Sequence, residues 1–240
     1  MAKCLVVGGN GFIGQAICRQ LMETGRHQVY VLERYCPSAP LADRWLTADI
    51  TSAESLAEAL GDQTFDWVFH VASLAADTGN PPEMVQVNLV GLVNVLKHAR
   101  DMAAQRFVLT SSISAYGWFP ATQYEAPLYL PVNEEHPIRC KDMYSSTKRM
   151  QEILALTFYH QYRLPVSVLR LTFTIGPRGQ GGGFFWRTFA EKLQAGRSVQ
   201  IPHFSPHELC HYVDVRDVAR MQVAVAEHPE AVGQVFNCCR

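Results

Sequence analysis

The segment that most constrains this chain is the glycine-rich run Gly8-Gly9-Asn10-Gly11-Phe12-Ile13-Gly14. It follows the apolar residues Cys4 to Val7 and opens a stretch with helical periodicity. Glycine lets the backbone turn sharply and lets a ligand approach it, and the free N–H groups at a helix start attract an anion. A structural turn after an edge strand would also use glycine, but a strand before it and a helix after it are typical of a dinucleotide-phosphate site.

Length and composition predict one globular domain. At 240 residues, with 48% hydrophobic and 18% charged residues, the chain can bury one substantial core. A net charge of -1 with scattered basic residues gives no basis for binding nucleic acid or an anionic membrane. No apolar run approaches the roughly 20 residues of a membrane span, and Met1-Ala2-Lys3 leads directly into a strand without room for a signal peptide. We therefore expect a cytoplasmic protein.

Cysteine usage agrees with that expectation. The seven cysteines are odd in number and include no Cys-x-x-Cys pair. We expect reduced, mostly buried thiols and no metal site.

Apolar strand-like runs alternate with helical patterns along the whole chain, and residues 1–240 are expected to form one domain. Near-continuous apolar strands separated by helices indicate a parallel sheet covered on both faces, and right-handed crossovers then give a doubly wound, Rossmann-type α/β sheet. The expected strands are Lys3 to Val7, Gln28 to Leu32, Trp67 to Ala72, Phe107 to Ser111, Val166 to Leu171, Tyr212 to Val215 and Gln234 to Cys238. The expected helices are Phe12 to Thr24, Ala53 to Leu60, Glu83 to Ala103, Met143 to Tyr162, Phe185 to Ala195 and Val215 to Glu227.

Local signals refine this outline. Gly25 is expected to end the first helix, and Thr51 with Glu54 to form a capping box for the second. The segments Gly117 to Asp142 and Gly176 to Gly183 break the alternation. Long loops inside a compact domain are usually lids or binding loops, and plain surface insertions are the alternative.

In a dinucleotide site, an acidic residue about 20 positions past the glycines forms hydrogen bonds with the ribose hydroxyls. Glu33 has that position, at the end of the second expected strand. Its carboxylate would accept hydrogen bonds from the ribose hydroxyls and repel a 2′-phosphate, which favours NAD over NADP. Arg34 follows directly and could instead hold a phosphate. Asp49 and Ile50, which end a third strand, could flank the adenine.

Tyr144 and Lys148 are one helical turn apart at the start of the helix expected over Met143 to Tyr162. Positions i and i+4 share a helix face, so the phenol and the ammonium should point into the same space. A nearby cation lowers the pKa of a tyrosine and makes the phenol usable as a proton donor or acceptor near neutral pH. Ser112 follows the fourth expected strand, where doubly wound sheets bind ligands, and would contact a substrate oxygen. No Gly-x-Ser-x-Gly surrounds the serines here, so a nucleophile elbow is not indicated.

Together these segments resemble the extended short-chain dehydrogenase/reductase family, and within it the NAD-dependent epimerases and dehydratases. The resemblance rests on Gly8 to Gly14, Thr110 to Ser112, Tyr144 to Lys148 and Tyr212 to Ala219, which occur in the family's order through nearly the whole chain.

The resemblance implies a role for each matching residue. Tyr144 would be the acid/base, Lys148 its partner and a ligand of the nicotinamide ribose, and Ser112 the third catalytic residue. The implied cofactor contacts are Gly8, Gly11, Phe12, Ile13, Gly14, Glu33, Arg34, Asp49, Ile50, Ala72, Ser73, Asn88, Tyr144, Lys148 and Phe173. The implied substrate contacts are Ser112, Ser114, Thr174, Arg178 and His211.

Two departures from the family pattern weaken a nucleotide-sugar assignment. Nucleotide-sugar members carry an arginine two residues before the aromatic that matches Tyr212, whereas Cys210 and His211 fill that stretch here. His211, or Arg178 among other arginines, would have to contact the pyrophosphate instead. Members also continue well past the strand matching Gln234 to Cys238, so the small substrate lobe is expected to come mainly from residues 173–211 or to be truncated.

Three hypotheses for function follow. The first is an NAD-dependent epimerase/dehydratase-type oxidoreductase acting on a secondary alcohol or ketone, as in a sugar or nucleotide-sugar derivative. The second is a reductase or dehydrogenase of a non-sugar carbonyl, steroid-like or flavonoid-like, with an apolar pocket from Trp118, Phe119 and Phe184 to Trp186. The third is a non-catalytic NAD(H)-binding module. The resemblance also implies a homodimer through a four-helix bundle made by the helices Glu83 to Ala103 and Met143 to Tyr162.

Overall fold

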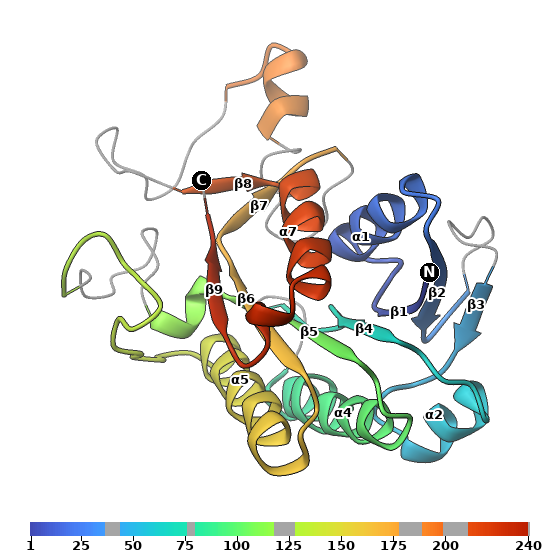
Figure 1. Ribbon diagram of the computed structural model, residues 1–240. Coiled ribbons are helices and arrows are strands. Elements are labelled where there is room, and N and C mark those ends of the chain that lie inside the picture. The colour runs from blue at the N-terminus through green and yellow to red at the C-terminus, as the bar shows by residue number, and fades with distance from the viewer. Residues whose placement is uncertain (37–43, 76–79, 118–127, 178–188, 199–210, 240) are drawn as a thin grey trace.

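Seven parallel strands form the centre of the molecule, in the order β3-β2-β1-β4-β5-β6-β9. Figure 1 shows this computed structural model, which describes residues 1–36, 44–75, 80–117, 128–177, 189–198 and 211–239. The strand order turns back at β1, which has β2 on one side and β4 on the other. In such doubly wound sheets, ligands bind at the carboxyl ends of the strands beside this turning point. The predicted fold class is confirmed.

The bounds of the elements follow the apolar runs closely. The strands of the main sheet are β1 (Ala2–Val7), β2 (His27–Glu33), β3 (Arg44–Thr47), β4 (Trp67–His70), β5 (Arg106–Ser112), β6 (Val166–Leu171) and β9 (Val235–Cys238). The α-helices are α1 (Phe12–Glu23), α2 (Ala53–Leu60), α3 (Pro81–Val85), α4 (Gly91–Asp101), α5 (Met143–Tyr162) and α7 (Val215–Glu227). A π-helical turn, η1 (Gln86–Val90), and two 3-10 turns, η2 (Ile113–Tyr116) and η3 (Pro229–Ala231), complete the set.

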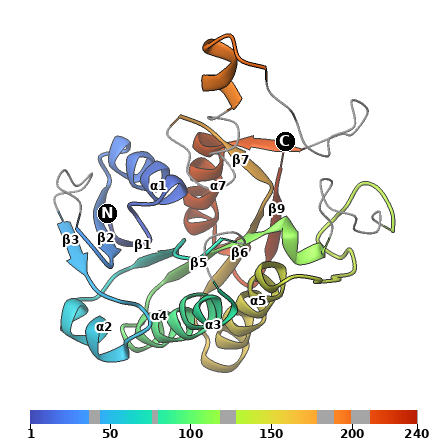
Figure 2. The ribbon, with the colours of Figure 1, turned by 180° about the vertical axis from the view of Figure 1, so that it is seen from behind.

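Helices cover both faces of the sheet, as Figures 1 and 2 show from opposite sides. α1 and α7 lie on one face, where Ile17, Leu21 and Val218 pack on strand residues such as Val6. α2, α4 and α5 lie on the other face, where Leu56, Leu96 and Ala155 take part in a second cluster. Burying each large aliphatic side chain contributes roughly 1.5–3 kcal/mol. The two layers therefore hold the strand ends, and the loops that follow them, in fixed places.

Two capping signals had different outcomes. Gly25 has a φ of +64° just past α1, which is the left-handed conformation expected of a glycine that ends a helix. The predicted Thr51–Glu54 capping box is wrong. The helix begins at Ala53, as predicted, so Ser52 rather than Thr51 is its N-cap, and Ser52 accepts a hydrogen bond from the backbone N–H of Ser55 at 3.1 Å.

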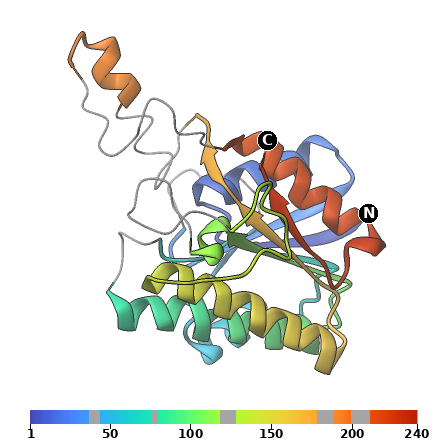
Figure 3. The same cartoon turned by 90° about the vertical axis from the view of Figure 1, so that its left-hand side faces the viewer.

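Two predicted elements also differ in the structure, and a third is described only in part. The helix predicted over Glu83 to Ala103 is divided into α3, η1 and α4, so a π-helical turn stands in its middle. The strand predicted over Tyr212 to Val215 is β8 (Tyr212–Asp214), which lies outside the main sheet and pairs with the unpredicted β7 (Phe173–Ile175). Residues 189–194 are helical and stand away from the sheet and its helices (Figure 3), while the start of the helix predicted over Phe185 to Ala195 lies outside the described residues.

Among the described residues, no helix combines the length and the apolar character that a membrane crossing requires.

Candidate active site and cofactor site

The turn between β1 and α1 depends on two glycines that admit no side chain. Gly8 has a φ of +87°, and a Cβ there would lie 2.6 Å from the backbone nitrogen of Ala72 at the end of β4. A Cβ on Gly14 would collide with the carbonyl oxygen of Gly8. The helix start is thus pressed against the strand ends at the turning point of the sheet. Gly11 is the N-cap of α1 and brings no capping side chain, and the first turn holds no acidic residue.

Glu33 closes β2 beside this turn. Its Oε1 accepts a hydrogen bond from the backbone N–H of Asn10 at 2.9 Å, which fixes the carboxylate against the glycine loop. Burial raises the pKa of Glu33, and the hydrogen bond from Asn10 acts in the opposite direction. Arg34 is exposed and places its guanidinium 5.0 Å from the ring centre of Tyr35, so in this structure it turns to a neighbour on the surface.

The two residues predicted beside the adenine have structural partners as well. Asp49 accepts hydrogen bonds through Oδ1 from the backbone N–H and the hydroxyl of Thr51, at 2.9 and 2.8 Å. Ile50 is buried, and its carbonyl oxygen accepts a hydrogen bond from the side chain of Asn94 at 2.9 Å. They follow β3 (Arg44–Thr47), which ends two residues before Asp49 rather than at it.

Asn88 connects the loop after β4 to α5 through hydrogen bonds. It is fully buried in the π-helical turn η1. Its side chain accepts hydrogen bonds from the backbone N–H of Leu74 (2.7 Å) and the hydroxyl of Ser73 (3.1 Å), and it donates to the Leu74 carbonyl and to Thr147 on α5, both at 3.1 Å. Ala72 and Ser73 are therefore held at the carboxyl end of β4, next to the glycine turn.

Ser112, Tyr144 and Lys148 converge at the carboxyl end of β5. Asp142 caps α5 in a reciprocal capping box with Ser145, which starts the helix immediately before Tyr144. The hydroxyl of Ser112 hydrogen-bonds the Tyr144 side chain. The Lys148 ammonium donates to the carbonyl oxygen of Thr110 at 3.1 Å and lies 5.8 Å from the centre of the Tyr144 ring. The phenol and the ammonium thus share one helix face, as their spacing predicts.

The pKa of the phenol differs from the expectation. Burial raises the pKa of Tyr144 to about 12, while the hydrogen bond to Ser112 lowers it and the charge of Asp142 raises it. Burial also lowers the pKa of Lys148 to about 8, against the charge of Glu152, which raises it. The predicted lowering of the tyrosine pKa by the lysine is wrong for the protein alone, because desolvation dominates and the ammonium donates to a backbone carbonyl instead of the phenol.

Residues 4–239 match the model of the NAD dependent epimerase/dehydratase family. The chain belongs to this family. It is 31% identical to cinnamoyl-CoA reductase 1 of Oryza sativa over 95% of this chain and 69% of that protein. It is 30% identical to a UDP-glucose 4-epimerase of Mycolicibacterium smegmatis over 98% of this chain and 76% of that protein. The chain spans 63% of the length of an uncharacterised Escherichia coli relative.

The fold has the same relatives. The structure of a Thermus thermophilus UDP-glucose 4-epimerase in complex with NAD superposes with a TM-score of 0.80 at 25% identity, covering 98% of this chain and 76% of that one. The residues present here fit the cofactor of the family. An uncapped helix start at Gly11 leaves N–H groups available to a pyrophosphate, and the Glu33 carboxylate beside it suits ribose hydroxyls.

The predicted residues of the substrate side are only partly described. Ser114 is buried, and its hydroxyl lies 3.0 Å from that of Ser112, which donates to it. Thr174 donates through its hydroxyl to the carbonyl of Thr172 at 3.1 Å. Phe173 packs on Tyr212 with ring centres 5.9 Å apart, and His211 is exposed. Arg178, Cys210 and the aromatic residues Trp118, Phe119 and Phe184 to Trp186 lie outside the described residues.

Sequence reasoning missed an ion-pair network next to the predicted catalytic residues. Glu152, on α5, accepts hydrogen bonds from Arg170 on β6, from Arg149 and from Ser111. Only the i+4 spacing of Glu152 from Lys148 could have pointed to it. The partners Ser111 and Arg170 are distant in sequence and give no local signal.

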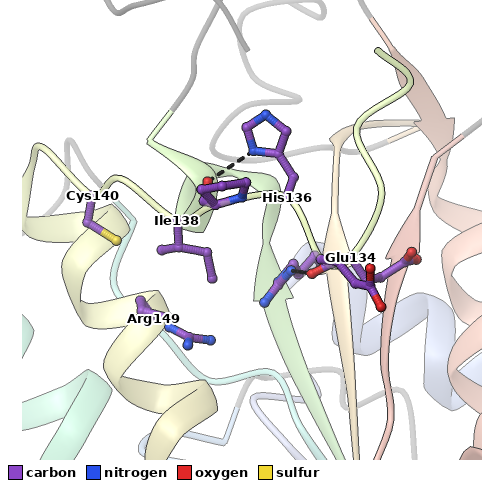
Figure 4. A pocket seen from close by; sticks show the side chains of 8 residues that line it. Glu134, His136, Ile138, Cys140 and Arg149 are labelled. Carbon is purple, nitrogen blue, oxygen red and sulfur yellow. Dashed lines mark hydrogen bonds between the residues drawn. The ribbon is translucent and has the colours of Figure 1, made fainter. Parts of the chain in front are cut away.

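One open pocket reaches this network from the outside (Figure 4). It is lined by loop residues from Glu134 to Cys140 and by Arg149 and Arg170. His136 closes one wall, where a hydrogen bond joins its Nδ1 and the carbonyl oxygen of Pro137 at 3.0 Å. Arg170 is bound to Tyr116 and to the Glu134 carbonyl, so the pocket floor is already occupied by internal hydrogen bonds.

Proposed function

We propose that this chain binds NAD and acts on a secondary alcohol or its ketone in a sugar or nucleotide-sugar derivative, as an epimerase/dehydratase-type oxidoreductase. The observation that carries the proposal is the meeting of Ser112, Tyr144 and Lys148 at the end of β5, on the α5 side of the glycine turn. A phenol, a hydroxyl and an ammonium in one place are the groups that hold and move the proton of a substrate hydroxyl.

In this proposal each side chain has a separate task. Ser112 donates a hydrogen bond to the substrate oxygen and orients it toward the phenol. As a phenolate, Tyr144 takes the hydroxyl proton at its phenolic oxygen, and as a phenol it gives a proton back to the substrate oxygen. Lys148 holds a positive charge beside the ring and favours phenolate when the proton has left. Bound NAD would supply the hydride acceptor and donor for the substrate carbon.

The remaining contacts would hold NAD. The backbone of Gly8, Gly11 and Gly14 leaves room for the pyrophosphate, with Phe12 and Ile13 starting the helix above it. Glu33 would bind the ribose and discriminate against a 2′-phosphate, which favours NAD over NADP.

A second substrate class is supported by one relative. The 31% identical protein from Oryza sativa is a cinnamoyl-CoA reductase, so a non-sugar carbonyl is the second candidate. The same three catalytic residues serve both substrate classes, because both reactions transfer a proton at an oxygen next to the carbon that exchanges hydride.

The test uses purified protein with NAD(H), separate samples of UDP-glucose, UDP-glucuronic acid and a cinnamoyl thioester, and the variants Tyr144→Phe and Ser112→Ala. Products are separated by chromatography and NADH is followed by absorbance. We expect turnover of one class and a loss of about 10²–10⁴-fold in kcat for Tyr144→Phe. Ser112→Ala, which keeps the phenol, should lose less.

Two results would contradict the proposal. Turnover that is unchanged in Tyr144→Phe would remove the phenol from the mechanism. NAD binding without turnover of any substrate in the panel would favour a non-catalytic binding module.

We also propose that the protein works as a homodimer in the cytoplasm. Cys4, Cys18 and Cys238 are buried free thiols, which fits a reducing compartment. The outer surfaces of α5 and of the α3–η1 segment carry exposed apolar side chains, which suit a bundle of four helices between two copies.

A further inference from the structure

Three consecutive residues at the end of β5 each bind one turn of α5. Ser112 hydrogen-bonds Tyr144, and the carbonyl of Thr110 accepts the Lys148 ammonium at 3.1 Å. Ser111, between them, donates through its hydroxyl to Oε1 of Glu152 at 2.6 Å. Tyr144, Lys148 and Glu152 follow each other at intervals of four residues, so they share one face of the helix. The third of these contacts between α5 and β5 is therefore made by the carboxylate of Glu152.

The Glu152 carboxylate is held by two arginines in addition to Ser111. It is fully buried, and both of its oxygens accept bonds of 2.8 Å from the guanidinium of Arg170 on β6, which is itself 2% exposed. Arg149 donates to Oε2 at 3.0 Å. Burial raises the pKa of Glu152, but the hydrogen bonds and charge of Arg170 outweigh it, so the pKa lies below its usual range and the group stays ionised.

We propose that Glu152 is a positioning residue for the proposed reaction, which sets the register of α5 on β5 and keeps Lys148 protonated. This inference rests on the proposed function of Tyr144 and Lys148. A buried ion pair adds little net stability compared with well-packed apolar side chains. Here the pair with Arg170 fixes the negative charge of Glu152 one helical turn from the buried ammonium of Lys148.

The other groups that face Lys148 carry no negative charge. His70, on β4, is 1% exposed, and burial followed by the charge of Lys148 lowers its pKa to about 3, so it is neutral. Tyr144, on the same helix, is protonated because burial raises its pKa. Thr110, on β5, offers only a carbonyl dipole. Among the described residues, Glu152 is the ionised group whose charge raises the pKa of Lys148.

The test measures the protonation of Lys148 directly. The chain has five lysines, so protein labelled with ¹³C at lysine Cε gives few signals, and Lys148→Arg assigns the one of interest. The signal is followed from pH 6 to pH 11 without cofactor or substrate. Glu152→Gln removes the charge, Glu152→Asp keeps it on a shorter side chain, and Arg149→Gln removes a half-buried partner of the same carboxylate.

We expect the Lys148 midpoint to fall by about one pH unit or more in Glu152→Gln. It should stay near the wild-type value in Glu152→Asp and in Arg149→Gln. A folded Glu152→Gln protein with an unchanged midpoint would overturn the proposal, and so would an equal fall in Glu152→Asp.

A second variant covers the case in which Glu152→Gln does not fold, since it leaves the Arg170 guanidinium buried without its partner. In Glu152→Met combined with Arg170→Met both charges are removed together, which buried sites tolerate better. The midpoint of Lys148 should fall in this protein too, and an unchanged midpoint contradicts the proposal. Because neither measurement needs turnover, failure to find a substrate would count against the proposed function and not against the role of Glu152.

Discussion

At Gly14, one methyl group is enough to disturb the site. A Cβ there would strike the carbonyl oxygen of Gly8, whereas at Gly11 the nearest atom, the same oxygen, would be 3.3 Å away. We expect Gly14→Ala to lose stability by more than 1 kcal/mol through overpacking, and NAD affinity with it. Gly11→Ala, the matched control, should unfold close to the wild-type temperature. Thermal unfolding and calorimetric NAD titration test both, and equal stability of the two variants would contradict this account of the turn.

Burial of Lys148 makes a prediction about pH. The folded protein holds the pKa of Lys148 at about 8, below the ordinary lysine value of 10.5, so the unfolded chain binds more protons between these values. Stability contributed by this site therefore rises with pH through that window, and the cost of burying the charge is largest below pH 8. We therefore compare the free energy of unfolding of Lys148→Met with that of the wild type. The difference should favour the variant by about 3 kcal/mol more at pH 7 than at pH 10.5. Denaturant unfolding at both pH values measures this, and a pH-independent difference would argue against a depressed pKa.

The residues of the site were predictable where the signal is local. Tyr144 and Lys148 are four positions apart on one helix, and Ser112 follows an evident strand, so their convergence could be inferred from the chain. The Glu152–Arg170 pair could not, because its members become neighbours only when α5 packs on β6. The pKa of Tyr144 was also beyond reach, since desolvation depends on how closely the surrounding chains pack.

At the scale of elements, the π-helical turn η1 serves to present Asn88. Asn88→Ala would leave the backbone N–H and carbonyl of Leu74 and the hydroxyl of Thr147 without this partner, at a cost of about 1–3 kcal/mol for each buried group left unpaired. We expect a clear fall in unfolding temperature and in NAD affinity. Asn94→Ala is the control, because Asn94 lies on α4, directly after η1, and its side chain donates to the carbonyl oxygen of Ile50. If both variants unfold alike, Asn88 has no special place in the structure.

The element pattern explains what the sequence could and could not predict. The strands of the main sheet are rich in apolar residues, so the sequence predicts Val166 to Leu171 at its observed bounds. η1 was missed because a π turn keeps nearly the same spacing of apolar residues as an α-helix. β7 was missed because Phe173–Ile175 is three residues long, and β8 was misplaced because its partner lies in that same short strand.

At the scale of the whole molecule, the two helical layers present different parts of the site. α1 and β2 present Glu33 and the glycine turn, while α5 on the opposite face presents Tyr144 and Lys148 (Figures 1 and 3). The sheet holds both at its carboxyl edge, and Asn88 connects them through Thr147. The α5 layer therefore carries both the proposed catalytic residues and the proposed dimer surface, so association of two copies would stiffen the helix that carries the phenol.

That link gives the last prediction. Ile153 and Met150 on α5 are 50% and 47% exposed, and Val90 on η1 is 37% exposed, which is costly for isolated apolar side chains but suits a helix-to-helix interface. We expect a dimer at micromolar concentration by light scattering, and a monomer for Ile153→Lys, because a charge would be buried in the interface. Leu193→Lys, at a residue that is 53% exposed on the helix over residues 189–194, should leave the dimer intact. The unfolding temperature of the wild type should rise with protein concentration, and that of Ile153→Lys should not. A wild-type monomer, or a dimer that survives Ile153→Lys, would place the interface elsewhere or remove it.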